Sequence, residues 1–326
     1  MLRHVPLFHY KHRGLERMNM KVILDVDTGV DDALGILLAI RSGEMDILGI
    51  TTVNGNVSLE QATVNTCKIL QLAGGEHIPV VKGADRPILR NTHFEHRVHG
   101  KDGLGGALKD MPVHKQAEDE HAVDFIIEQV RRYPGEVTLV MTAPLTNLAL
   151  AVMKYPELVR QVKEVVVMGG VVQGFGNVTP TAEYNMYVDP EAAKLVFKAG
   201  FSSLTLVGLD VTRKALLTEE HIASLGDSPL ARYVRESTAD YMQRYYERNG
   251  VWACALHDPL AVGVVLNREL VTVKSYYVDV ETRSELCDGQ TVCDFQNRLS
   301  QEANVHVCLD VAADAFLRLF IRVLRR

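Results

Sequence analysis

The chain has 326 residues, of which 47% are hydrophobic and 23% are charged, and its formal net charge is -6. This composition is typical of a globular protein and excludes a disordered chain, a collagen-like repeat and a coiled coil. The slightly acidic charge balance argues against nucleic acid as a partner, and the absence of an apolar run of ~18 residues argues against a membrane span.

The first twenty residues differ from the rest of the chain. They are basic, with Glu16 as their only acid, and they contain neither the apolar segment nor the cleavage site of a secretory signal. We expect residues 1–20 to be a disordered extension, with a targeting or interaction arm as the alternative, and residues 21–326 to form a single domain. The five cysteines lack zinc-site spacing, so we interpret them as reduced thiols of a cytoplasmic protein.

From Lys21 onward, short apolar segments alternate with segments of helical pattern. Expected strands cover residues 21–27, 46–53, 78–81, 136–142, 164–168 and 204–209, and expected helices between them cover 31–40, 58–73, 118–132, 146–154 and 190–198. The first helix has no polar face, so we expect it to be buried on nearly all sides. Beyond Thr218 the pattern is mostly helical up to Val271, including 230–249, and short β-rich segments then precede a last helix over 312–324.

Apolar strands separated by helices predict an α/β fold, with a mainly parallel open sheet flanked by helices and a helical region over the site. Two long segments, residues 83–115 and 169–181, have no regular periodicity and follow strand ends. Ligands of open α/β sheets bind outside the carboxyl ends of the strands. We therefore expect the functional site at these loops.

The strongest single motif is DVDTGVDD, which runs from Asp25 to Asp32 and holds four carboxylates. A helix dipole could account for Asp31 or Asp32 alone. Four carboxylates at a buried junction repel one another unless protons or a cation compensate their charge. We therefore predict a hard divalent cation bound by oxygen ligands at this turn.

The sequence His257-Asp258-Pro259 has a simple structural explanation, because Asp258 would cap a helix that begins at Pro259. The other motifs of the chain favour a functional role for this sequence instead. In chain order, DVDTGVDD is followed by TTVNGN (51–56), TAPLTN (142–147), MGG (168–170), GNVTPTAEYN (176–185) and HDP (257–259).

In this order and at this spacing, the six motifs resemble the inosine-uridine-preferring nucleoside hydrolase family, over nearly the whole chain from Lys21. The family usually has Pro at the position of Thr28, a difference that removes no metal ligand. The resemblance implies a Rossmann-like nucleoside hydrolase fold and hydrolysis of ribonucleosides to free base and ribose in nucleoside salvage. It also implies small-molecule ribonucleosides as partners and a homodimer or homotetramer.

The resemblance further implies roles for individual residues. Ca²⁺ would be the cofactor, with a bound water as nucleophile, and its ligands would be Asp27, Asp32, Asp258 and the backbone carbonyl of Thr142. Asp27 would also be the general base, and His257 would be the general acid near the leaving base. The predicted substrate-binding residues are Asp31, Asn56, His99, Met168, Asn177, Glu183, Asn185, Tyr241, Tyr245 and Asp258.

Within that set, Tyr241 and Tyr245 lie one helical turn apart and would flank the base. Stacking on a phenol tolerates any base, so we expect broad specificity, with inosine and uridine both cleaved.

Two alternatives remain open. DVDT is also the start of an aspartyl-phosphate phosphatase motif, although Gly29 in the fifth position counts against it. A non-catalytic ribonucleoside-binding protein would normally lack Asp27, which is present.

Overall fold

The computed structural model describes residues 19–326, so the predicted extension lies outside the described residues except for Asn19 and Met20. Met20 already belongs to the first strand, where its N–H donates to the carbonyl of Glu44. The strands of the main sheet are β1 (Met20–Val26), β2 (Met45–Thr52), β3 (Val80–Lys82), β4 (Thr138–Met141), β5 (Glu164–Met168), β6 (Leu204–Val207), β9 (Val271–Tyr276) and β12 (Val305–Val311).

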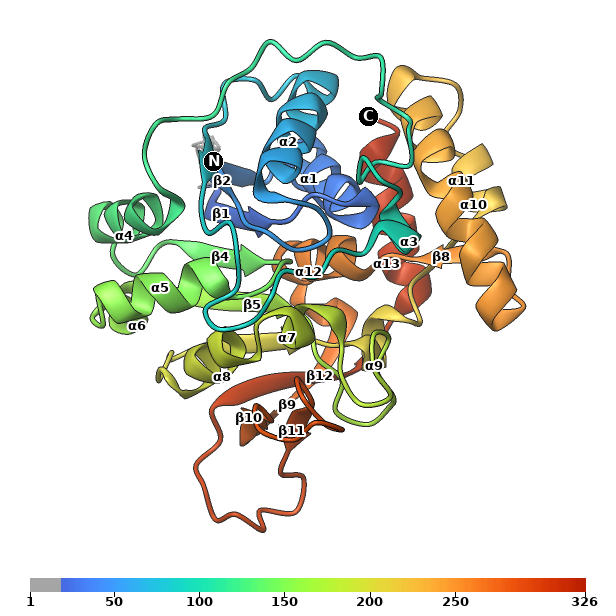
Figure 1. The fold of residues 1–326 in the computed structure, drawn as a ribbon. Coiled ribbons are helices and arrows are strands. Elements are labelled where there is room, and N and C mark those ends of the chain that lie inside the picture. The colour runs from blue at the N-terminus through green and yellow to red at the C-terminus, as the bar shows by residue number, and fades with distance from the viewer. Residues whose placement is uncertain (1–18) are drawn as a thin grey trace, which may run out of the picture.

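These strands form an eight-stranded sheet in the order β3-β2-β1-β4-β5-β6-β12-β9 (Figure 1). All neighbours are parallel except β12 and β9, which pair antiparallel at one edge. The prediction of an α/β fold with a mainly parallel sheet is thus confirmed. The last strand in the sequence, β12, is not at an edge of the sheet but lies between β6 and β9.

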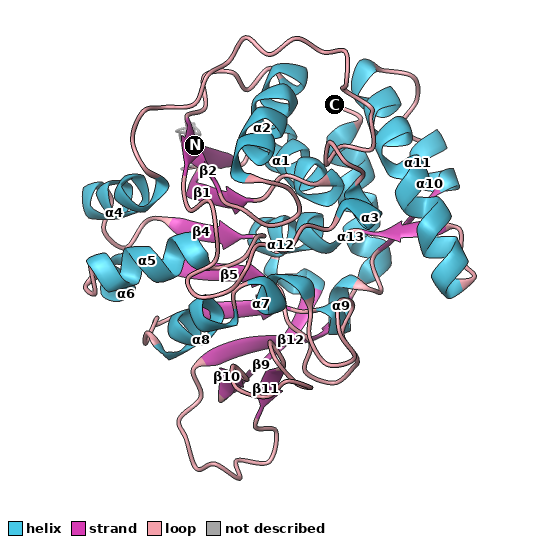
Figure 2. Cartoon of the chain, in the orientation of Figure 1, coloured by secondary structure: helices cyan, strands magenta, loops and turns pink. Residues whose placement is uncertain are grey.

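Helices cover both faces of the sheet (Figure 2). One face carries α1 (Val30–Ser42), α2 (Leu59–Ala73), α12 (His257–Leu266) and α13 (Ala313–Leu324), and the other carries α4 (Ala122–Arg132), α5 (Thr146–Lys154), α6 (Leu158–Gln161) and α8 (Pro190–Lys198). Successive strand residues point to opposite faces, so Leu24 of β1 packs with the first group of helices and Ile23 packs with the second.

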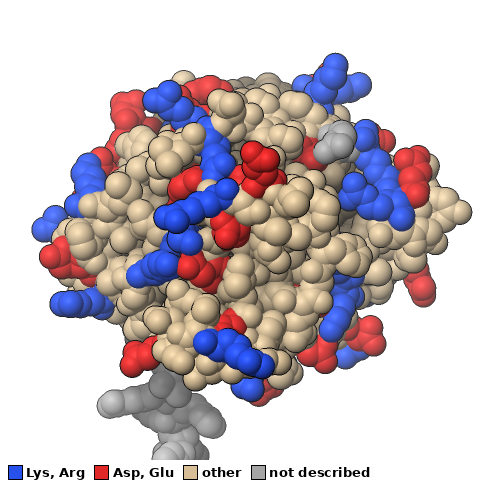
Figure 3. Space-filling view, turned by 60° about the horizontal axis from the view of Figure 1, so that its bottom comes forward, with Lys and Arg blue, Asp and Glu red and all other residues tan. Residues whose placement is uncertain are grey.

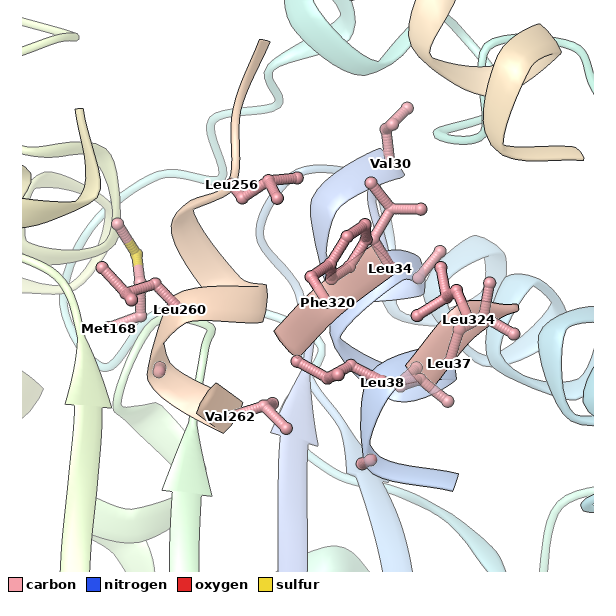
Figure 4. Packing of buried hydrophobic residues seen from close by; sticks show 14 of the residues in the cluster. Val30, Leu34, Leu37, Leu38, Met168, Leu256, Leu260, Val262, Phe320 and Leu324 are labelled. Atoms are coloured by element: carbon pink, nitrogen blue, oxygen red, sulfur yellow. The ribbon is translucent and has the colours of Figure 1, made fainter. Parts of the chain in front are cut away.

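Helix α1 is buried on nearly all sides, as its uniformly apolar sequence predicts. Figure 4 shows Leu34 and Leu37 of α1 packed together with Phe320 and Leu324 of α13, whereas Leu260 of α12 lies beside Met168 of β5. A Cβ atom added at Gly35 would lie 3.5 Å from the backbone of Asp258, so α1 and α12 approach closely. This packing brings the first turns of both helices together at the carboxyl ends of the strands.

The remaining elements are α3 (His96–His99), α7 (Tyr184–Val188), α9 (Leu209–Thr212), β7 (Leu216–Thr218), α10 (Glu219–Ala223), α11 (Pro229–Asn249), β8 (Ala253–Ala255), a 3-10 turn (Arg268–Leu270), β10 (Val278–Val280) and β11 (Thr291–Cys293). Among them, β7 pairs with β8 and β10 pairs with β11 in two separate two-stranded sheets. No helix among residues 19–326 combines the length and the apolar character needed to cross a membrane.

Several predicted boundaries shift for local reasons. Helix α4 begins at Ala122 rather than at Glu118, because the N–H of Glu118 donates to Val80 and extends the sheet edge instead. The helical region after Thr218 is interrupted by β8, which pairs with β7. Asp258 is not the helix cap that the HDP motif suggested, because α12 already begins at His257 without a side-chain cap.

Candidate active site

A cavity of about 790 Å³ opens at the carboxyl ends of the strands. Its walls come from the two predicted loops, from the first turns of α1 and α12, and from the last turns of α11. Of the site residues predicted from the sequence, all but Asp27 and Asp32 line this cavity, and these two are buried. The structure therefore gathers the predicted residues in one place.

Three buried carboxylates meet at the cavity. Asp31 and Asp32 in the first turn of α1 and Asp258 in the first turn of α12 each offer an oxygen, and these oxygens all lie within 4.8 Å of one another. Oxygens bound to one Ca²⁺ at 2.3–2.6 Å can be at most about 5 Å apart. The spacing of this acidic trio, Asp31, Asp32 and Asp258, therefore fits a single cation.

No lysine or arginine side chain that the structure describes forms an ion pair with the acidic trio, and His99 Nδ1 lies 3.7 Å from Asp31 Oδ1. The Oδ1 atom of Asp31 is buried without a hydrogen bond. Burial raises the pKa of Asp31 and of Asp32 to about 6, and burial together with the neighbouring carboxylates raises the pKa of Asp258 well above its usual range. A divalent cation would remove this repulsion, so the donor set fits a hard metal ion.

Asp27 lies outside the acidic trio and is held by Asn56. The backbone N–H of Asn56 donates to Asp27 Oδ2 at 2.6 Å, and its side-chain amide donates to Asp27 Oδ1 at 3.1 Å and to Asp32 Oδ2 at 3.2 Å. A Cβ atom at Gly55 would lie 1.9 Å from Asp27 Oδ2, so the NGN turn needs glycine for this close approach. Asn56 thus fixes Asp27 beside the acidic trio.

Residues predicted to bind ribose also build the cavity wall. Glu183 caps α7, with its carboxylate accepting from the N–H groups of Gly170, Asn185 and Met186. The Asn185 amide donates to the carbonyl of Thr142 at 2.9 Å, the group predicted as a metal ligand. Helix α7 itself escaped prediction because a five-residue helix shows too little periodicity.

Two histidines line the cavity, and burial favours the neutral form of both rings. The N–H of Val30 donates to His99 Nδ1 at 3.1 Å, and burial lowers the pKa of His99 to about 4. The Nδ1 atom of His257 lies 2.7 Å from Thr212 Oγ1, and burial, with the nearby Arg213 charge, lowers the pKa of His257 to about 3.

The two predicted tyrosines differ in burial. Tyr241 is buried, and its hydroxyl donates to the carbonyl of Ala255 at 3.3 Å. Tyr245 is only partly buried and lines the outer part of the cavity.

The sequence did not predict the arginines of the cavity wall, which are Arg213, Arg244 and Arg248. Arg213 donates to the carbonyls of Phe175 and Gly176 at 2.7 and 2.9 Å and holds that loop over the cavity. Along α11, Arg244 lies three positions after Tyr241, and Arg248 lies three positions after Tyr245. This spacing places all four side chains on one face of the helix, so the sequence pattern could have predicted both arginines. Further lining residues outside the six motifs are Glu95, Val98, Phe175, Glu247 and Asn249. Gly176, Val178 and Tyr184 also line the cavity and belong to the GNVTPTAEYN motif, but the sequence did not single them out.

Comparison with known proteins agrees with the site. Residues 22–318 match the family model described as inosine-uridine preferring nucleoside hydrolase. The uridine nucleosidase 1 of Arabidopsis thaliana is 39% identical, over 84% of this chain and 82% of that protein. The inosine-uridine preferring nucleoside hydrolase of Crithidia fasciculata is 36% identical, over 95% of this chain and 98% of that protein.

A solved structure shows the same fold. The purine-preferring ribonucleoside hydrolase from Gardnerella vaginalis superposes with a TM-score of 0.87 at 34% identity, over 94% of this chain and 98% of the other. Motifs, fold and relatives agree along almost the entire described chain, and the protein belongs to the inosine-uridine preferring nucleoside hydrolase family.

Proposed function

We propose that this protein hydrolyses the N-glycosidic bond of ribonucleosides and releases the free base and ribose. The observation that carries the proposal is the buried acidic trio at the cavity of a chain from this family. An oxocarbenium-like transition state needs base assistance to water on one side of the sugar and help to the departing group on the other. The cavity offers candidate residues for both tasks.

The proposed cofactor is Ca²⁺, held by Asp27, Asp32, Asp258 and the carbonyl of Thr142. Asp31, the remaining member of the acidic trio, offers a further carboxylate oxygen at the same place. When bound, the ion would acidify and position the attacking water. Asp27 would accept the proton of that water. When no cation is bound, burial raises the pKa of Asp27 well above its usual range, and the nearby Asp32 charge adds to the shift.

The sugar would be bound on the wall beside the acidic trio. Asn56, Asn177, Glu183 and Asn185 line the cavity with polar groups, and Met168 adds an apolar surface. Asn56, Glu183 and Asn185 are fixed by the hydrogen bonds described above, and Asn177 Oδ1 accepts from the N–H of Tyr184 at 2.9 Å. Preorganised polar groups of this kind favour a substrate that supplies every matching hydroxyl.

The leaving base would lie toward His99, His257 and Tyr245. Since the Tyr241 hydroxyl is engaged by Ala255, we propose that Tyr241 contributes mainly its ring. Stacking and neutral imidazole donors do not select strongly between ring sizes, which supports broad specificity with inosine and uridine both cleaved. The relatives carry names that mention uridine, inosine with uridine, and purines.

We further propose one nucleoside hydrolase domain over residues 21–326, which the single continuous main sheet supports. A cytoplasmic role in nucleoside salvage is compatible with the five cysteines, all of which are free thiols. A homodimer or homotetramer remains our proposal from the family resemblance. On the face shown in Figure 3, acidic and basic side chains are intermixed, which supports small molecules rather than nucleic acid as ligands.

The test is direct. The Ca²⁺-loaded protein is incubated with inosine, uridine, cytidine and adenosine, and free ribose is measured over time. We expect ribose from inosine and uridine at the highest rates. Absence of ribose with all four nucleosides would refute the proposed reaction, and release of phosphate from phosphorylated substrates instead would favour the phosphatase alternative.

A further inference from the structure

We propose that Thr212 is a positioning residue for His257: its hydroxyl donates to Nδ1 and thereby keeps the imidazole proton on Nε2. His257 would then meet the leaving base as a neutral N–H donor. Thr212 can have this role only if the protein cleaves nucleosides as proposed above.

The contact is short and isolated from solvent. Thr212 ends α9, which follows β6, and its side chain is fully buried. Its Oγ1 atom lies 2.7 Å from His257 Nδ1, and no other hydrogen bond of this hydroxyl occurs within residues 19–326. The His257 ring lines the cavity, and no described residue forms a hydrogen bond with its Nε2 atom.

The direction of this hydrogen bond follows from the chemistry of a buried hydroxyl. If His257 donated through Nδ1–H, the Thr212 hydroxyl proton would have no acceptor among the described residues. A buried donor without an acceptor is energetically unfavourable. If Thr212 donates, its proton is satisfied and Nδ1 serves as the acceptor, so a neutral His257 must carry its proton on Nε2.

His99 provides an independent example of the same arrangement. A backbone N–H can only donate, so the bond from Val30 leaves His99 Nδ1 without a proton and places the ring proton on Nε2. The two imidazoles of the cavity therefore share one tautomer. Ring nitrogens of purines and carbonyl oxygens of pyrimidines both accept such N–H donors, and the hydrogen bonds strengthen as the departing base gains negative charge.

Two substitutions distinguish the effect of the Thr212 hydroxyl from the effect of its side-chain volume. Thr212→Val removes the hydroxyl and keeps the volume, and Thr212→Ser keeps the hydroxyl. We expect Thr212→Val to lower kcat for inosine by ~10-fold or more, by analogy with other enzymes in which a buried partner fixes the histidine tautomer. Hydrolysis of p-nitrophenyl riboside should change by less than about 2-fold, because its leaving group needs little assistance.

A matched control is Thr238→Val in α11, which removes another buried threonine hydroxyl, one that donates to Val234 at 2.7 Å. This variant and Thr212→Ser should retain the wild-type ratio of the two rates. Equal losses of Thr212→Val on both substrates, or no loss on either, would overturn the role of Thr212. A wild-type protein that cleaves neither substrate would instead refute the proposed function.

The tautomer itself is measured on the wild-type protein. Long-range ¹H–¹⁵N NMR spectra distinguish the protonated ring nitrogen from the bare one, and the signal that disappears in His257→Gln identifies His257. We expect the proton on Nε2. A proton on Nδ1 would overturn the proposal even if Thr212→Val failed to fold.

Discussion

At the scale of single residues, Asp27 and the acidic trio have different surroundings although all four are buried carboxylates. Both Asp27 oxygens accept hydrogen bonds from Asn56, whereas Asp31 Oδ1 accepts no hydrogen bond from the described residues. A carboxylate held in a fixed orientation suits proton transfer, and an unsatisfied oxygen suits a ligand or a cation. The two environments therefore predict different consequences of substitution.

Asp27→Ala should lower kcat by about 10²- to 10⁴-fold, the usual contribution of a general base, while KM changes much less. Steady-state hydrolysis of inosine checks this prediction. Asp46→Ala, at an exposed position of β2, is the control and should behave like the wild type. Near-normal kcat in Asp27→Ala would assign the base elsewhere.

The sugar hydroxyls provide a second residue-scale prediction. Asp31 and Asn56 line the cavity with acceptors and donors that ribose could satisfy. A 2′-deoxyribonucleoside would leave buried polar groups unpaired, so kcat/KM for uridine should exceed that for 2′-deoxyuridine by ~10³-fold or more. The two substrates share one base, which makes the comparison internally controlled, and comparable rates would contradict hydroxyl recognition.

At the scale of elements, the long loop 83–115 is fixed to the turn that follows β1. Asn65 of α2 donates to the carbonyls of Thr28 and Asp102 and so joins the turn to the loop. Gly103 packs against this bridge, because a Cβ atom there would lie 2.7 Å from Asn65 Nδ2 and 3.2 Å from Thr28 O. The same loop carries His99 to the cavity.

Gly103→Ala and Gly106→Ala form a matched pair. Both glycines have a left-handed backbone, with φ of +78° and +75°, but a Cβ at Gly106 would meet nothing within 4 Å. Gly106→Ala should lower the free energy of unfolding by about 1–2 kcal/mol through its backbone alone. Gly103→Ala should lose about 1–3 kcal/mol more through overpacking, as measured in urea. Equal losses of unfolding free energy in the two variants would mean that the loop moves to accommodate the added methyl group at Gly103.

The elements also show what sequence reasoning can achieve. Helix α5 and strand β5 occur at the predicted residues, and Asp189 caps α8 through the N–H of Ala192, because strong periodicity or capping chemistry is local. The residues from six motifs line one cavity because parallel strands end at the same edge. Arg213 could not be placed, since its partners are backbone carbonyls of an irregular loop that has no sequence signal.

At the scale of the whole molecule, the acidic trio joins two helices that come from opposite ends of the described chain. Helix α1 supplies Asp31 and Asp32, and α12 supplies Asp258. A bound cation would therefore connect the early and late parts of the fold. Ligands that bind only the folded state increase its stability by an amount that grows with the logarithm of their concentration relative to Kd.

Removal of metal with a chelator should lower Tm, and restoring Ca²⁺ to about 100 times its Kd should recover about 2.7 kcal/mol of stability. Differential scanning calorimetry at several Ca²⁺ concentrations checks this expectation. Asp32→Asn should no longer respond to Ca²⁺, whereas the exposed-site variant Asp46→Asn should respond normally. A Tm independent of Ca²⁺ in the wild type would argue against a metal site.

The position of β12 inside the main sheet has a consequence for biosynthesis. This strand separates β6 from β9, so during translation the growing chain makes the first six strands long before the segment that completes the sheet exists. Its pairings span large sequence separations and are slow to form. A nascent chain that ends before Asp258 also lacks one carboxylate of the acidic trio. Activity should therefore appear only after the ribosome has nearly finished the chain.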